Sequence, residues 1–367
     1  MAEPLKNVIN RPLLEHAAAA MAVAWPAFDR AGLLSRSLDA HWEQRALKER
    51  LAYVAQVMRS LLPSAYPEAQ AVITGAVQHL LDSEGEQLHF VYGFWPDFSA
   101  LYGLDQPGIA LDALETVTRW TTAEYAIRPF LLRHPAQTYA RMYAWATHPS
   151  PMVRRLSTEG FRPRLPWGMG LPALKKDPTP VLSVLEMLKD DPAETVRRSV
   201  ANNLNDISKD HPGLALDVAR RWLGRSAETD WVVRHACRGL LKRGHPEALA
   251  LFGFDPGQAN IALTGLQADG QVRIGEALLF SIALKNTGNQ PETIRLEYRV
   301  EYRKAGGKSS AKVFHLRETV LTPGSELKVS RELSFRDLTT RRHYPGAHRL
   351  AVIANGVVLG EVGFEVL

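Results

Sequence analysis

Three related stretches decide the fold of the first two-thirds of the chain: Ser150-Pro-Met-Val-Arg-Arg155, Ala193-Glu-Thr-Val-Arg-Arg198 and Asp230-Trp-Val-Val-Arg-His235. Each follows a turn that contains Asp, Pro or Thr, and each begins a segment with helical spacing of its apolar residues. Their central valines are 43 and then 37 residues apart, a spacing typical of HEAT repeats, in which pairs of helices stack on a shared core. We therefore predict an all-α, HEAT-like helical solenoid over residues 1–257.

The period of the apolar residues changes to two after Phe252-Gly-Phe-Asp-Pro-Gly257. Leu296, Tyr298, Val300 and Tyr302 alternate with arginines and glutamates, which is the pattern of a half-buried strand. Seven such runs lie near residues 259–267, 276–285, 292–304, 311–321, 325–335, 347–354 and 357–367. Seven short strands in about 110 residues predict a second, all-β domain, an immunoglobulin-like sandwich over residues 258–367.

The composition is that of a folded protein, with 46% hydrophobic and 23% charged residues. No apolar run reaches the roughly 18 residues of a membrane span, and the run from Ala17 to Ala27 lacks the basic start of an export signal, so we expect a cytoplasmic protein. The single cysteine, Cys237, excludes an intramolecular disulfide and a multi-cysteine zinc site, and we expect it to be a small core residue.

Charge is unevenly distributed within the net +5 of the chain. Residues 1–118 have a balance of −6, residues 119–257 of +7 and residues 258–367 of +4. The last two-thirds is therefore a candidate surface for a polyanion. The sequence has no phosphate-binding glycine-rich loop, no His-Glu-x-x-His pair and no Gly-x-Ser-x-Gly elbow, which excludes several common classes of enzyme.

Three carboxylates are expected to share the concave face of the solenoid with arginines: Glu124, Glu159 and Asp206. Residues four apart share a helix face, so Arg155 aligns with Glu159, and Arg198 aligns with Asn202 and Asp206. A helix that begins at Thr121 would place Glu124 and Arg128 in a similar relation. In the third repeat the aligned residues are His235 and Lys242 or Arg243.

Each carboxylate also has a purely structural interpretation. Glu124 stands three residues after Thr121 and could complete a capping box. Glu159 could pair with Arg155 along its helix, and Asp206 could cap a turn before Lys209. Arginines suit phosphates and carboxylates suit a developing cation, so the occurrence of all three carboxylates on aligned helices favours a functional role.

A loop follows Glu159: Gly160-Phe-Arg-Pro-Arg-Leu-Pro-Trp-Gly-Met-Gly170. Its two prolines and three glycines prevent a regular helix, so we expect Trp167 on a rigid loop beside the concave face. Trp145 and Trp222 fall within helical apolar stripes instead and are expected in the core.

Two stretches resemble the AlkC branch of the HEAT-like DNA alkylation-repair glycosylases: Ser157-Thr-Glu-Gly-Phe-Arg-Pro-Arg-Leu-Pro-Trp167 and Val196-Arg-Arg-Ser-Val-Ala-Asn-Asn-Leu-Asn-Asp-Ile-Ser-Lys-Asp-His-Pro212. The similarity extends over most of residues 1–257, and some members of the family carry an added immunoglobulin-like domain. The resemblance implies excision of the cationic bases 3-methyladenine and 3-methylcytosine from duplex DNA without base flipping. It implies catalytic roles for Glu124, Glu159 and Trp167, with Asp206 as a further acidic member.

Physical chemistry agrees with that role. A cationic base is already a good leaving group, so we expect no metal and no organic cofactor. Carboxylates fixed near the sugar would stabilise its oxocarbenium-like transition state and orient water. No lysine is placed to form a Schiff base, so we expect a monofunctional hydrolase that leaves the DNA strand intact.

Basic residues of both domains are expected to hold DNA. In the solenoid these are Arg155, Arg162, Arg164, Arg198, Lys242 and Arg243, and in the sandwich Lys304, Lys308, Arg341, Arg342 and His343. The sandwich residues lie in the third-to-fourth and fifth-to-sixth connections, which share one end in immunoglobulin order. We expect a monomer on duplex DNA. The rival function is a nonenzymatic HEAT-repeat scaffold for DNA or an acidic protein, which explains the cations but not the carboxylates.

Overall fold

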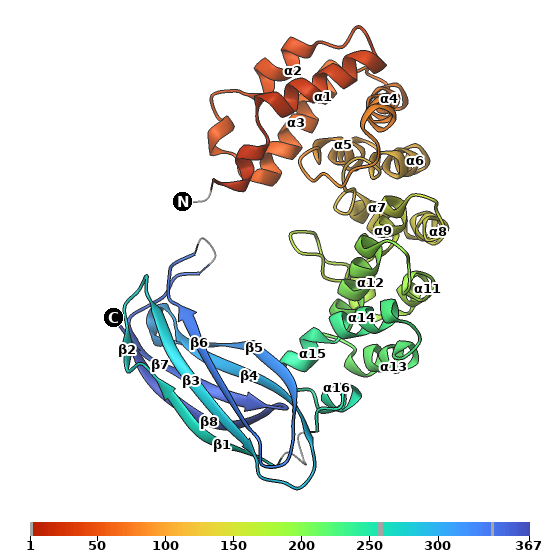
Figure 1. Cartoon of the computed structure of the whole chain (residues 1–367). Coiled ribbons are helices and arrows are strands. Elements are labelled where there is room, and N and C mark those ends of the chain that lie inside the picture. The colour runs from red at the N-terminus through yellow and green to blue at the C-terminus, as the bar shows by residue number, and fades with distance from the viewer. Residues whose placement is uncertain (1–2, 256–259, 339–340) are drawn as a thin grey trace. The chain divides into compact units, whose positions relative to one another are not determined.

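The computed structural model describes residues 3–255, 260–338 and 341–367, and the chain forms two compact units (Figure 1). The first unit comprises Met1–His211 and Trp222–Ala236, and the second comprises Pro212–Arg221 and Cys237–Leu367. The helices that follow Cys237 therefore group with the strands, although their sequence pattern is helical. The predicted domain boundary between residues 257 and 258 lies outside the described residues.

Helices make up the first unit and the start of the second. Their bounds are α1 Arg11–Ala24, α2 Arg30–Ser37, α3 Leu47–Leu61, α4 Tyr66–Glu84, α5 Phe94–Tyr102, α6 Pro107–Val117, α7 Ile127–Arg133, α8 Pro135–Trp145, α9 Pro151–Glu159, α10 Pro172–Lys176, α11 Thr179–Leu188, α12 Glu194–Ile207, α13 Pro212–Trp222, α14 Ala227–Ala236, α15 Arg238–Lys242 and α16 Pro246–Leu251. Helices close in sequence pack together, α4 against α1 and α6, and α12 against α9 and α14. This succession of packed helices confirms the predicted all-α solenoid.

The three Val-Arg stretches begin or lie within α9, α12 and α14, the three helices that pack in a row. Val153, Val196 and Val233, which mark the repeat spacing, are all fully buried. Trp145 and Trp222 are buried as expected, and so is Cys237, which lies in the turn between α14 and α15. That turn interrupts the helix, so the predicted alignment of His235 with Lys242 or Arg243 on one continuous helix face is wrong.

The first arginine of the motif has a structural role in two of the repeats. Arg154 Nη1 donates to the backbone oxygens of His148 and Pro149 at 2.8 Å each, and its other nitrogens bind the carboxylate of Asp191. Arg197 Nη1 makes the equivalent bonds, at 2.6 and 3.0 Å, to the carbonyls of the turn that precedes its own helix. The second arginine, Arg155 or Arg198, takes no part in these turn contacts.

The strands of the second unit form two sheets. Their bounds are β1 Ile261–Ala268, β2 Gln271–Val272, β3 Ala277–Asn286, β4 Glu292–Arg303, β5 Ser309–Leu321, β6 Glu326–Ser334, β7 Gly346–Ala354 and β8 Val357–Val366. One sheet has the order β1-β3-β6 and the other the order β2-β8-β7-β4-β5. Seven strands match the predicted runs, and the sandwich is confirmed. The eighth, β2, has only two residues, too few to show alternation in the sequence.

The inner faces of the two sheets share one apolar core, in which the ring centroids of Phe280 and Tyr298 are 4.9 Å apart. At one end of the sandwich, the end of β4 lies beside the β6–β7 connection. There the guanidinium carbon of Arg341 lies 5.3 Å from the centroid of the Tyr302 ring. The start of β3 reaches the same end, where Phe335 N donates to Glu276 O. The predicted clustering of these connections is therefore confirmed.

Within the described ranges, no helix is long and apolar enough to span a membrane. The same ranges contain no group of three or more His, Cys, Asp or Glu side chains arranged to hold a metal ion.

Candidate active site

Glu159 is the last residue of α9 and lies in a fully hydrogen-bonded setting. Its Oε1 accepts from Arg162 Nη1 at 2.7 Å and its Oε2 from Ser199 Oγ, on α12, at 2.6 Å. The following residue must be glycine, because a Cβ at position 160 would lie 2.7 Å from the Ile127 side chain and 2.9 Å from Leu156 O. Glu159 does not pair with Arg155 along its helix, so the purely structural interpretation considered for this carboxylate is wrong.

Asp206 stands behind Glu159 and is only 1% exposed. Arg162 Nε donates to Asp206 Oδ2 at 2.8 Å, and Lys209 Nζ donates to Oδ1 at 2.8 Å. Burial opposes the charge on Arg162, but Glu159 and Asp206 outweigh it and hold its pKa above the ordinary value. Arg162 thus bridges two carboxylates inside the protein, and this geometry corrects its predicted contact with a DNA phosphate.

Glu124 lies in the turn before α7, which begins at Ile127 and not, as predicted, at Thr121. Its Oε2 accepts from Thr122 Oγ1 at 2.9 Å and from Arg155 Nη2 at 2.7 Å. Thr121 instead donates its hydroxyl to His89 O, so the capping box considered as a structural alternative for Glu124 does not form. Arg155 therefore joins Glu124 to the helix that ends at Glu159.

Trp167 is 69% exposed, on a loop whose backbone is held at several points. Its φ of 62° is in the left-handed region, which a residue with a side chain adopts only when its surroundings impose it. Arg128, fully buried, donates to Gly160 O at 2.9 Å and to Met169 O at 2.6 Å, near the two ends of the loop. Lys48 Nζ, on α3, donates to Trp167 O at 2.7 Å. Trp167 thus lies on a loop outside any regular helix, as the two prolines and three glycines predicted.

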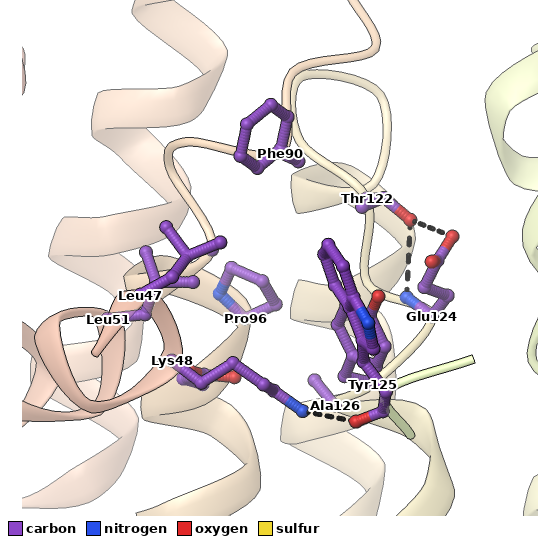
Figure 2. A pocket seen from close by; sticks show the side chains of 12 residues that line it. Leu47, Lys48, Leu51, Phe90, Pro96, Thr122, Glu124, Tyr125 and Ala126 are labelled. Atoms are coloured by element: carbon purple, nitrogen blue, oxygen red, sulfur yellow. Dashed lines mark hydrogen bonds between the residues drawn. The ribbon is translucent and has the colours of Figure 1, made fainter. Parts of the chain in front are cut away.

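A pocket between α3, α5 and the Glu124 turn includes Trp167 in its wall (Figure 2). Lys48 Nζ lies 4.3 Å from the ring centroid of Tyr125, and burial, followed by the charge of Glu124, raises the pKa of Tyr125 to about 12. Burial also raises the pKa of Asp97 to about 6, against the opposing charge of Lys48. Sequence reasoning missed Lys48, Asp97 and Tyr125, because they come from three separate segments with no shared motif.

A second depression is an open groove between α9 and α12. Its lining includes Arg155, Glu159, Arg198, Ser199 and Asn202. Arg198 has 59% of its side chain exposed and pairs with Glu194 at the surface. The groove thus places two arginines beside the Glu159 carboxylate, which is the predicted combination of cations and acid.

The remaining predicted cations lie in different surroundings. Arg164 forms a surface pair with Asp210, with N···O distances of 3.1 and 2.6 Å. Lys242 and Arg243 are exposed and belong to the second unit. Burial, followed by the positive charges of Arg341 and Lys242, lowers the pKa of Lys312, so both cations lie close enough to Lys312 to oppose its charge.

The basic end of the sandwich contains Lys304, Lys308, Arg341, Arg342 and His343. Lys308 and Arg342 are exposed, and Lys304 and Arg341 are partly so. His343 is 5% exposed and packs against Phe335, with ring centroids 4.8 Å apart. The predicted DNA contact of His343 is therefore wrong, since an aromatic core encloses its ring and lowers its pKa by burial.

Two family models match the chain. One, described as a DNA alkylation repair enzyme, matches residues 40–240, and the other, the C-terminal Ig-like domain of the uncharacterised protein YhaZ, matches residues 263–367. The uncharacterized protein YhaZ of Bacillus subtilis (strain 168) is 40% identical over 363 residues, which is 99% of each chain. The solved structure of the Pseudomonas fluorescens alkylpurine DNA glycosylase AlkC, bound to DNA containing an abasic site analog, matches with a TM-score of 0.93 and 36% identity over 100% of both chains.

Proposed function

The chain belongs to the DNA alkylation repair enzyme family and is a DNA glycosylase of the AlkC type, and we propose that it releases cationic N3-methylated bases, 3-methyladenine and 3-methylcytosine, from duplex DNA. The observation that carries this proposal is the pair of hydrogen-bonded carboxylates, Glu124 and Glu159: Arg155 binds the first and lines a groove with the second, and the exposed Trp167 lines a pocket with Glu124. A scaffold that only binds DNA has no use for acids beside phosphate-binding arginines.

The chemistry follows from charge. A base that already carries a positive charge leaves as a neutral molecule, so the slow event is the growth of positive charge on the deoxyribose. Glu124 and Glu159 are held by hydrogen bonds before substrate binds, so they stabilise that charge without reorganising. Either carboxylate can also orient the attacking water. Asp206 acts indirectly: it binds Arg162, which in turn binds and positions Glu159.

Trp167 and the groove arginines position the substrate. The exposed indole offers a π face to the cationic base or the sugar, and such contacts contribute about 0.5–2 kcal/mol. Arg155 and Arg198 would take the flanking phosphates. The groove beside Glu159 is open, which supports excision without enclosing the base in a pocket.

Selectivity tests the proposed function directly. We expect the purified protein to release 3-methyladenine and 3-methylcytosine from alkylated duplex DNA, and to leave uracil in place, since a wall of carboxylates favours only bases that depart from a cationic state. A bulkier N3-alkyl cation should also be released, because the groove beside Glu159 is open. Chromatography of the freed bases gives the answer, and efficient uracil release would contradict the proposal.

We also propose that the basic end of the sandwich binds DNA phosphates, with the protein acting as a monomer. The double substitution of Lys308 and Arg342 by alanine should lower the slope of log Kd against log salt concentration by about 2, because each lost phosphate contact releases about 0.9 fewer counterions. The matched control replaces Lys285 and Lys328, which lie toward the opposite end. Equal slopes for both doubles would remove this surface from the DNA interface. Light scattering of the complex checks the monomer.

A further inference from the structure

Two exposed apolar side chains, Leu88 and Phe90, lie on the segment between α4 and α5. Leu88 is 45% exposed and Phe90 is 41% exposed, although both sit beside the acidic site. Leu88 lines the groove with Arg155 and Glu159, and Phe90 lines the pocket with Glu124 and Trp167. Figure 2 shows the Phe90 ring at the edge of that pocket, on the side away from Lys48. Each of the two apolar side chains therefore shares a depression with one of the two carboxylates.

The backbone that carries the pair is fixed. Residue 89 pairs with Thr121 as in a parallel sheet, and His89 N donates to Trp120 O at 3.2 Å while His89 O accepts from Thr122 N at 3.0 Å. Glu86, at the start of the segment, binds Arg119 Nε at 2.7 Å and Ser150 Oγ at 2.7 Å. The segment is thus tied both to the Glu124 turn and to the residue that caps α9.

This extended backbone explains why both side chains point outward. Successive side chains of an extended chain alternate between faces. His89 points inward, where its ring centroid lies 4.9 Å from that of Trp120 and 5.6 Å from that of Tyr92. Leu88 and Phe90 are consequently placed on the opposite, exposed face, and the ring contacts of the half-buried histidine fix that orientation.

We propose that Leu88 and Phe90 form an apolar wedge that inserts between stacked bases next to the lesion. This proposal rests on the proposed function, since it takes duplex DNA as the partner. Neither side chain can bind phosphate, whereas the faces of bases are apolar and accept such side chains in proteins that unstack and kink DNA. The wedge opens the stack at the step that faces the carboxylates, so the sugar of the lesion comes within their reach while the base stays unenclosed.

Unstacking can be measured without any catalysis. A duplex with a tetrahydrofuran abasic analogue flanked by 2-aminopurine reports the loss of stacking as a rise in fluorescence. We expect the full-length wild-type protein to raise the signal, and Leu88→Ala with Phe90→Ala to abolish the rise and weaken binding about tenfold, the size typical of one lost stacking contact. Placing tryptophan instead of alanine at position 90, as Phe90→Trp, should restore both the fluorescence rise and the affinity. Because both side chains are exposed, the urea midpoint should stay unchanged.

The matched control is the pair Leu132→Ala and Met187→Ala, equally exposed apolar residues on α7 and α11 that line neither depression. We expect this control to keep the wild-type fluorescence rise and affinity. A full fluorescence rise with the Leu88 and Phe90 double variant would overturn the wedge, whatever its catalytic rate. Base release by the same variants is followed in parallel, so a failed wedge with intact excision is distinguished from a failed function, in which wild type itself releases no methylated base.

Discussion

Glu159→Gln lowers the single-turnover rate of 3-methyladenine release by about 10²–10³-fold, the usual loss when one preorganised electrostatic group is removed. Glutamine keeps the size of the side chain and can still meet Ser199, so the change removes charge and little else. Arg162 retains its second partner, Asp206, and the fold should hold. DNA affinity should change far less than the rate.

The control for this prediction is Asp105→Asn, which removes an equally negative side chain that is 82% exposed and pairs with Arg133. It should retain the wild-type rate, and Glu124→Gln should behave like Glu159→Gln. Single-turnover kinetics with enzyme in excess separate the chemical step from product release. Wild-type rates in both glutamine variants would mean that these carboxylates are structural.

Arg162→Met destabilises the protein by about 3–5 kcal/mol, the cost typical of leaving a buried charge without its partner. This one substitution removes the shared ion-pair partner of two carboxylates, Glu159 and Asp206. Asp206 retains its ion pair with Lys209. Methionine fills much of the same space, so lost volume contributes little. The free energy of unfolding from urea titration measures the effect.

The matched variant is Arg164→Met, two residues along the same loop. Its side chain is 38% exposed and pairs with Asp210 at the surface, where such pairs contribute about 0–1 kcal/mol. We therefore expect a small change in its urea midpoint. A comparable loss of stability in both variants would show that the loop, and not the buried ion-pair network, carries the effect.

Sequence patterns predicted those parts of the fold in which periodicity is long and regular. The Val-Arg stretches and the alternating strands extend over several residues each, so their elements and buried valines were predictable. The turn at Cys237 and the start of α7 were not, because a single break in helical hydrogen bonding leaves no mark on the apolar period. The predicted positions that depended on these two breaks were therefore wrong: the alignment of His235 with Lys242 or Arg243, and the place of Glu124 within a helix.

The candidate site divides in the same way. Glu159 and Trp167 were predicted from a continuous motif, and Glu124 from the family resemblance and from a helix expected to begin at Thr121. Which cation meets which acid could not be predicted, since Arg155 crosses to Glu124 and Arg162 turns inward only when separate helices pack. His343 was misassigned for a related reason, because its basic neighbours in the sequence do not reveal the aromatic rings that enclose it in space.

The grip of Arg128 on both ends of the Trp167 loop has a thermodynamic consequence. A free aromatic side chain on a flexible loop loses conformational entropy when it is immobilised against a ligand, and that loss weakens association. In this chain the loop is already ordered by a buried guanidinium, whose pKa of about 10, lowered mainly by burial, still leaves it protonated at neutral pH. The backbone of the loop is ordered during folding, so less conformational entropy is lost when the indole contacts DNA.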